Sequence, residues 1–296
     1  MIDRASIFSN PEIVTLLKTR FVPVAIDQWY QRRQQDNEGK FYQKIANQGP
    51  RKVGQGTTQG LYAADAGGML LGFTNNRGVD RVQAMMKSAL AKFRPPAQAA
   101  ALDRGKPEAR FSPQPPPGGL IVRVHSKVLG GYEDTEDATR RIFQESLGRD
   151  NLWISAAEHA ALAKGELPEA LLRRIARFHL VDNTRGEPPM WEAGEVRAVQ
   201  GALRGGVLRA TVKLQSAKGD RGFDAELYGV VETKGGKVTR MDWVAKGEFF
   251  GEGTYTGNAP KGKFPLGISF TLADGKDAAD AIPPQASRGW IQGYMP

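Results

Sequence analysis

A proline-rich stretch interrupts this chain about a third of the way along its 296 residues. It begins with Pro95-Pro96 and includes a run of three prolines and two glycines before residue 120. Proline lacks a backbone N–H and disfavours the helical conformation in the residue before it, so regular structure seldom continues through such a stretch. We therefore expect two domains, at residues 1–94 and 119–296, joined by a Pro-rich linker at 95–118.

Helix and strand patterns alternate before the linker, which is typical of an α/β domain. Asn10-Pro11 indicates a helix start, because asparagine caps helices and proline suits the first helical position. The apolar run from Phe21 to Ile26 predicts a buried strand. Further helices are expected at 39–47 and 79–93, and a β-hairpin at 59–64 and 69–74.

Three short stretches in this half, at 8–14, 21–27 and 60–73, carry a resemblance to a known family. The first reads Phe-Ser-Asn-Pro-Glu-Ile-Val and the second Phe-Val-Pro-Val-Ala-Ile-Asp, while the third runs from Gly-Leu-Tyr to Gly-Phe through the hairpin. Together they resemble thioredoxin-like proteins of the spermatogenesis-associated (DUF255) type. The resemblance covers residues 6–93 and implies an α/β thioredoxin-like scaffold for the first domain.

The chain departs from that family at the positions that carry the family's chemistry. It contains no cysteine, so the Cys-x-x-Cys pair that the family places ahead of the region matching Met1–Phe8 is absent. Thr57-Thr58 stand where the family has its cis-proline. Disulfide exchange needs a thiolate nucleophile, so the resemblance implies a degenerate, redox-inactive scaffold without a cofactor. The family's first strand is also lacking, and that sheet edge would need another cover, for example from the C-terminal domain.

The second domain changes its hydrophobic period part-way along. One strand is expected at 120–124, and helical periodicity dominates 135–179. From 195 to 273 hydrophobic residues alternate with polar ones, with tight-turn signals at Gly205-Gly206 and Gly235-Gly236. We predict an α+β domain whose helices precede a curved antiparallel β-meander.

The most polar cluster of this domain begins at the end of its last predicted helix. His179, Asp182 and Arg185 lie close together there and would suit acid–base or anion-binding chemistry. The alternative is a helix C-terminus followed by an ordinary turn, since histidine is favourable at a helix C-terminus and Asp-Asn-Thr is good turn chemistry. His179, Asp182 and Glu252 are the candidates for a catalytic role, and Arg185 is a candidate for binding.

Aromatic and acidic residues supply the other candidates in the second domain. Trp191 and Tyr255 belong to a set of aromatics that would line a ligand cavity on a curved sheet, although such residues more often form the core. Asp242, Glu248 and Glu252 would provide a carboxylate pair of the glycosidase kind if the fold brought two of them together. With three histidines and no cysteine, we predict no metal site.

Positive charge is concentrated in the first domain. Residues 1–95 carry 14 lysines and arginines against 7 acidic residues, whereas the rest of the chain carries 27 against 25. A basic cluster attracts nucleic acid and other polyanions, for which the candidate contacts are Arg32, Arg33, Lys40 and Lys44. The alternative is an ordinary solvated surface.

Hydropathy and the N-terminal residues bound the cellular location. No apolar run approaches the ~18 residues needed to cross a bilayer, and no signal-peptide pattern is visible. We expect no membrane span and a cytoplasmic location, or a periplasmic or secreted one if a signal peptide has been removed. The preferred hypothesis is a non-catalytic binding protein for an unknown protein or small-molecule ligand. The alternatives are a carboxylate-dependent hydrolase in the second domain and a first domain that binds nucleic acid.

Overall fold

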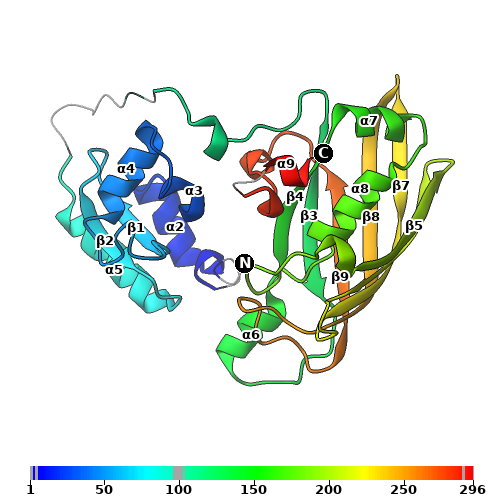
Figure 1. Cartoon of the computed structure of the whole chain (residues 1–296). Coiled ribbons are helices and arrows are strands. Elements are labelled where there is room, and N and C mark those ends of the chain that lie inside the picture. The colour runs from blue at the N-terminus through cyan, green and yellow to red at the C-terminus, as the bar shows by residue number, and fades with distance from the viewer. Residues whose placement is uncertain (1–2, 4–5, 96–102, 104, 289–290, 296) are drawn as a thin grey trace. The chain divides into compact units, whose positions relative to one another are not determined.

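A computed structural model describes residues 3, 6–95, 103, 105–288 and 291–295 of the chain. They form a mixed α/β structure with two antiparallel sheets, one of two strands and one of seven (Figure 1). The chain divides into two compact units, an N-terminal unit of residues 3–113 and a C-terminal unit of residues 114–296. The division falls inside the proline-rich stretch. In the described ranges, no helix is long and apolar enough to cross a membrane.

Helices are the main regular structure of the N-terminal unit. They are α2 (Pro11–Arg20), α3 (Gln28–Gln31), α4 (Asn37–Ala46) and α5 (Val79–Lys92), with the 3-10 turns η1 (Ile7–Ser9) and η2 (Ala109–Phe111). As predicted, Asn10 caps α2, because its side-chain oxygen accepts hydrogen bonds from the N–H groups of Glu12 at 3.0 Å and Ile13 at 3.1 Å. The apolar faces of η1, α2 and α5 meet in a small core of Ile7, Ile13, Val82 and Met86.

The predicted hairpin is present in this unit. β1 (Leu61–Ala64) and β2 (Leu70–Thr74) pair in antiparallel register, with Tyr62 opposite Phe73. Their rings make an edge-to-face contact with centroids 4.8 Å apart. Among the described residues of the unit, these are the only two strands.

The predicted buried strand at Phe21–Ile26 is wrong. This segment connects α2 to α3, pairs with no strand and leaves Val22, Val24 and Ile26 89%, 74% and 43% exposed. A buried strand needs partners along its edges and a layer over its faces. The apolar residues of this segment are typical of a buried strand, but the described part of the chain supplies neither partner strands nor a covering layer.

The end of the predicted linker packs on the N-terminal unit. Phe111 is buried, and its ring centroid lies 6.4 Å from that of Trp29 and 6.0 Å from that of Tyr30. Glu108 accepts a hydrogen bond from the Gln35 N–H at 2.8 Å. This part of the stretch therefore belongs to the folded unit, while 96–102 and 104 lie outside the described residues.

The C-terminal unit is built on the seven-stranded sheet, in the order β4-β3-β9-β8-β7-β6-β5 (Figure 1). Its strands are β3 (Leu120–Val128), β4 (Gly148–Ile154), β5 (Val196–Arg204), β6 (Val207–Gln215), β7 (Gly222–Lys234), β8 (Lys237–Phe250) and β9 (Lys263–Leu272). Its helices are α6 (Ala138–Glu145), α7 (Ala156–Ala163), α8 (Glu169–Phe178) and α9 (Ile291–Tyr294), with the 3-10 turns η3 (Ala193–Glu195), η4 (Ala278–Ala281) and η5 (Gln285–Ser287). Strands β5 to β9 form the antiparallel meander that the sequence predicts.

One face of this sheet is largely covered and the other is largely open. Along β6, buried Leu208, Ala210, Val212 and Leu214 alternate with exposed residues. The buried side chains face the core. Helix α7 packs on this side of the sheet against β8, and α8 packs against β5. The predicted turn at Gly205-Gly206 joins β5 to β6, with φ of 56° and 77° that only glycine adopts readily.

The edge strand β4, which the sequence did not predict, is clasped by the C-terminal segment. The Asn151 side chain donates hydrogen bonds to the carbonyls of Ala279 at 2.7 Å and Ile282 at 2.8 Å. The neighbouring carboxylate of Asp150 accepts one from the Gln285 N–H at 2.9 Å. Because neighbouring side chains in a strand point to opposite faces, the segment contacts both faces of β4.

Candidate functional site

The loop after α8, which carries the predicted polar cluster, is buried. Asp182 forms an ion pair with Arg185 and also accepts a hydrogen bond from the Thr184 hydroxyl at 2.6 Å. Arg185 Nε donates to the carbonyl oxygens of Thr256 at 3.2 Å and Gly257 at 3.1 Å. These contacts fasten the loop to the connection between β8 and β9, and they leave neither charge facing solvent.

His179 lies in a second buried group, with Asp150 and Tyr294. Its Nε2 is 2.5 Å from the Tyr294 hydroxyl, and its Nδ1 is 3.2 Å from Asp150 Oδ2 without the alignment of a hydrogen bond. The Trp153 N–H donates to the same hydroxyl oxygen at 3.4 Å. Burial raises the pKa of Tyr294 far above its ordinary value. His179 thus helps to hold α9 in place.

A third buried pair lies beside these two. The Ser126 hydroxyl donates to the Asn183 side-chain oxygen across Gly148. A Cβ at Gly148 would lie only 1.8 Å from that oxygen and 2.0 Å from the hydroxyl, so glycine is required there. Polar side chains that satisfy one another in this way favour the structural interpretation of the cluster.

The three catalytic candidates do not form one hydrogen-bonded group in the part of the chain that the structure describes. His179 and Asp182 belong to separate buried groups, as above. Glu252 is exposed, and its carboxylate accepts a hydrogen bond from the Ala259 N–H at 3.2 Å. Proton transfer needs near-contact geometry, so this arrangement offers no acid–base pair built from them.

The acidic candidates on β8 pair with basic residues instead of with one another. Asp242 accepts a hydrogen bond from Arg240 Nε at 2.5 Å, and Glu248 lies 3.6 Å from Lys263 Nζ. Tyr255 is 72% exposed. In the described residues, no group of three or more acidic or histidine side chains could hold a metal ion.

The predicted binding role of Trp191 is wrong, because its side chain is 1% exposed. Its Nε1 donates to the Leu180 carbonyl at 2.8 Å, and the Arg221 guanidinium lies 3.8 Å from its ring centroid. Burial lowers the pKa of Arg221. Trp191 is therefore a core residue that is held by a polar contact and a cation–π contact.

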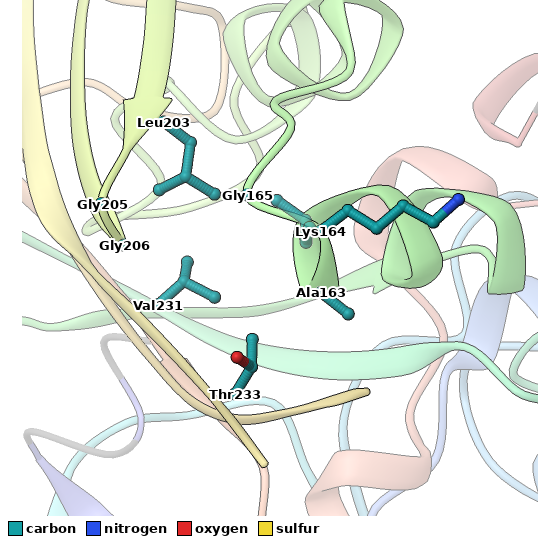
Figure 2. A pocket seen from close by; sticks show the side chains of 9 residues that line it. Ala163, Lys164, Gly165, Leu203, Gly205, Gly206, Val231 and Thr233 are labelled. Atoms are coloured by element: carbon teal, nitrogen blue, oxygen red, sulfur yellow. The ribbon is translucent and has the colours of Figure 1, made fainter. Parts of the chain in front are cut away.

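A notch of about 320 Å³ opens where the end of α7 faces the β5–β6 turn and strand β7 (Figure 2). Leu203, Val231 and Thr233 line it from the strands, with Ala163 and Gly165 from the end of α7. Lys164 carries the only charge in this lining, and Figure 2 shows its side chain extending away from Leu203 and Val231. The notch therefore lacks the convergent polar groups that fix a ligand.

The four predicted polyanion contacts do not gather on one element. Arg32 follows α3 and donates to the Gly56 carbonyl, and Arg33 stacks on the Trp29 ring. Lys40 and Lys44 lie one turn apart on α4, where the Lys44 ammonium donates to the Gly67 carbonyl at 2.6 Å. That bond closes one side of a second depression, of about 420 Å³, beside the β1–β2 turn.

The Phe21–Ile26 segment is the most exposed apolar stretch among the described residues of the N-terminal unit. No backbone hydrogen bond reaches Val22–Ile26 from the described residues. The segment is nevertheless held at both ends. Phe21 packs against the small core at its start, and Asp27 caps α3 at its end by accepting from the Trp29 N–H at 2.8 Å.

Known proteins offer no guide to these surfaces. Comparison of the chain with protein-family models, with curated proteins and with solved structures finds no match. The thioredoxin-like interpretation of the N-terminal unit stays a prediction. A function must therefore be inferred from the geometry of the molecule.

Proposed function

We propose that this chain is a non-catalytic binding protein whose N-terminal unit takes up an extended segment of a partner protein. The Phe21–Ile26 segment is the observation that carries the proposal, because Val22 and Val24 are 89% and 74% exposed. Contiguous apolar surface left in water marks interaction sites. Covering such a side chain completely contributes roughly 1.5–3 kcal/mol.

The C-terminal unit supports the proposal because two of its candidate catalytic groups, His179 and Asp182, are buried. The buried polar side chains of its candidate cluster contact one another, as in the Asp182–Arg185 and His179–Tyr294 pairs. Groups that act on a substrate must reach it, and these groups are sealed inside the unit. We assign this unit the role of a stable platform.

A degenerate thioredoxin-like scaffold is the frame we propose for the N-terminal unit. Its order of a helix, the Phe21–Ile26 segment, two helices, a hairpin and a helix supports that frame. The sequence holds no cysteine, so disulfide exchange has no thiolate to use. Binding is the role that such a scaffold retains.

A peptide-display selection against the full chain tests the proposal. A library of random linear peptides is panned on the wild type and on the double variant Val22→Thr/Val24→Thr, which keeps the β-branched shape but removes the apolar surface. The matched control is Val207→Thr/Val244→Thr, whose valines are 44% and 47% exposed on the C-terminal sheet. We expect the wild type and the control to enrich the same peptides and the 22/24 variant to lose them.

Two outcomes would contradict the proposal. One is a selection that enriches no peptide on the wild type above the level of an unrelated protein. The other is turnover of an ester, glycoside or dithiol substrate by the purified chain at a rate that survives Val22→Thr/Val24→Thr.

A further inference from the structure

We infer that the partner joins the Phe21–Ile26 segment as an antiparallel β-strand that is acidic towards its C-terminal end. This inference rests on the proposed function and specifies which atoms bind and what the partner carries. Its observations are the free backbone of the segment, the position of its proline and the charges on the last turn of α2.

The backbone of the segment offers one edge that is complete for pairing. In an extended chain the N–H and C=O groups of one residue point to one side, and those of the next residue point to the other. Paired as a strand, Val22, Val24 and Ile26 would present three donors and three acceptors on one edge. Pro23 lies on the opposite edge, where it removes a donor. A partner strand consequently gains a full ladder only beside Val22, Val24 and Ile26.

The two ends of the segment are already fixed. Its first residue, Phe21, has the extended conformation of a strand, with φ −132° and ψ 162°. The contact of Phe21 with the small core and the cap that Asp27 provides to α3 fix its two ends. A strand that is held before binding loses less conformational freedom when its partner arrives.

The charges beside the segment select the partner. Lys18 and Arg20 are exposed on the last turn of α2, directly before the segment, and neither has an ion pair with a carboxylate in the described residues. The N-terminal unit as a whole carries 17 basic residues against 9 acidic ones. At the other end stands the acidic Asp27, so negative charge on the partner is favoured only near Phe21.

The orientation of the partner strand decides which of its ends carries the acidic residues. A single added strand pairs slightly better in antiparallel than in parallel orientation. In the antiparallel orientation the C-terminal end of the partner lies beside Phe21, next to Lys18 and Arg20. The partner is thus an extended segment whose alternating apolar residues are followed by carboxylates.

Synthetic peptides on the full chain test each part of this inference. The probe alternates threonine and valine and ends in three glutamates; its matched forms carry the glutamates at the N-terminal end or replace them with glutamines. We expect the probe to bind, measured by fluorescence anisotropy, and both matched forms to bind about tenfold more weakly. N-methylation of alternate peptide amides should abolish binding in one register and spare it in the other.

Proline substitutions test which edge of the protein pairs. Val24→Pro removes an N–H from the complete edge, whereas Ala25→Pro removes one from the edge that Pro23 already interrupts. We expect Val24→Pro to lower the affinity for the probe peptide by about tenfold, and Ala25→Pro to change that affinity by less than about twofold. Val24→Thr, which keeps the N–H, separates this effect from the loss of apolar surface, and circular dichroism checks that each variant is folded.

Charge reversal tests the choice of partner. Lys18→Glu/Arg20→Glu should weaken the glutamate probe and remove most of its salt dependence, while the control Arg81→Glu/Lys87→Glu on α5 should not. Equal binding of the glutamate and glutamine peptides would overturn the inference. So would a single-stranded DNA oligonucleotide that displaces the probe, because the basic surface would then serve nucleic acid.

The two proposals fail in different ways. If display selection yields peptides that bind through Val22 and Val24 but tolerate Val24→Pro, the binding function stands and strand pairing is wrong. If no peptide binds the wild type in either assay, the proposed function itself is wrong.

Discussion

The two units differ in the cover that they give to one of their segments. In the C-terminal unit, β4 pairs with β3 on one side, and its polar residues Asp150 and Asn151 bind the chain that follows β9. In the N-terminal unit, Phe21–Ile26 is more apolar in sequence than β4, yet it has no partner strand in the described residues. The comparison teaches that the cover of a segment does not follow from its own apolar content, because the cover comes from other segments or from other molecules.

The units also differ in how they use charge. The C-terminal unit buries ionic groups in pairs, as with Glu158 and Arg174, whose atoms approach to 2.6 Å with both side chains at least nine-tenths buried. The N-terminal unit keeps most of its basic excess at the surface. Buried pairs fix one arrangement of the chain, whereas exposed charges are available to a partner.

The largest effect should come from breaking a buried pair in the C-terminal unit. Asp182→Ala leaves the Arg185 guanidinium buried beside the Thr256 and Gly257 carbonyls without its counter-charge. We expect a loss of about 3–5 kcal/mol in the free energy of unfolding, measured by urea titration with tryptophan fluorescence. The control is Lys261→Ala, which removes the exposed ion pair with Glu133 and should cost less than about 0.5 kcal/mol. Equal losses in the free energy of unfolding for the two variants would mean that the Asp182–Arg185 pair does not stabilise the buried loop.

A smaller, pH-dependent effect is expected at Tyr294. Its folded pKa is raised by burial, so the stability that this group contributes is complete below the unfolded value of about 10 and falls as the pH rises above it. Tyr294→Phe removes the bond to His179 and should cost about 1–3 kcal/mol at neutral pH, but the variant should lose less on going to alkaline pH.

Tyr62 of the N-terminal unit sharpens that test. Burial, aided by the nearby Tyr42, raises its pKa to about 12, so its contribution should stop falling near that pH. The contribution of Tyr294 should still be falling there, because its pKa is raised further. Unfolding titrations between pH 9 and about 12 on the wild type, Tyr294→Phe and Tyr62→Phe measure the slopes. If Tyr294→Phe has the wild-type slope, Tyr294 does not titrate with unfolding.

Local signals predicted the elements of the fold well where neighbouring residues decide them. The cap at Asn10, the hairpin around residue 65, the glycine turns and the alternation along β6 all depend on residues close in sequence. β4 was missed because its cover comes from residues more than a hundred positions later, including Ile282. Phe21–Ile26 was predicted as buried because its composition is that of a covered strand.

The candidate site was harder to predict for the same reason. The sequence places His179, Asp182 and Arg185 close together, but the structure puts His179 in one buried group and Asp182 with Arg185 in another. Their partners, among them Asp150 and Thr256, come from distant strands and loops that no local pattern could connect to them. The sequence of Phe21–Ile26 does not indicate that it is exposed, because its exposure depends on whether other parts of the chain cover it.

The smallest effect, and the most direct test of the comparison, is the same substitution made once in each unit. Val24 and Val124 both lie in extended, valine-rich stretches, but Val24 is 74% exposed and Val124 is 3% exposed within β3. Val24→Thr should change the free energy of unfolding by less than about 0.5 kcal/mol, because its hydroxyl remains in water. Val124→Thr should lose about 1–3 kcal/mol, because the hydroxyl would enter an apolar core. Thermal and urea unfolding of both variants give the values. If Val24→Thr destabilises its unit as much as Val124→Thr does, then Val24 is covered in solution and the segment is not open to a partner.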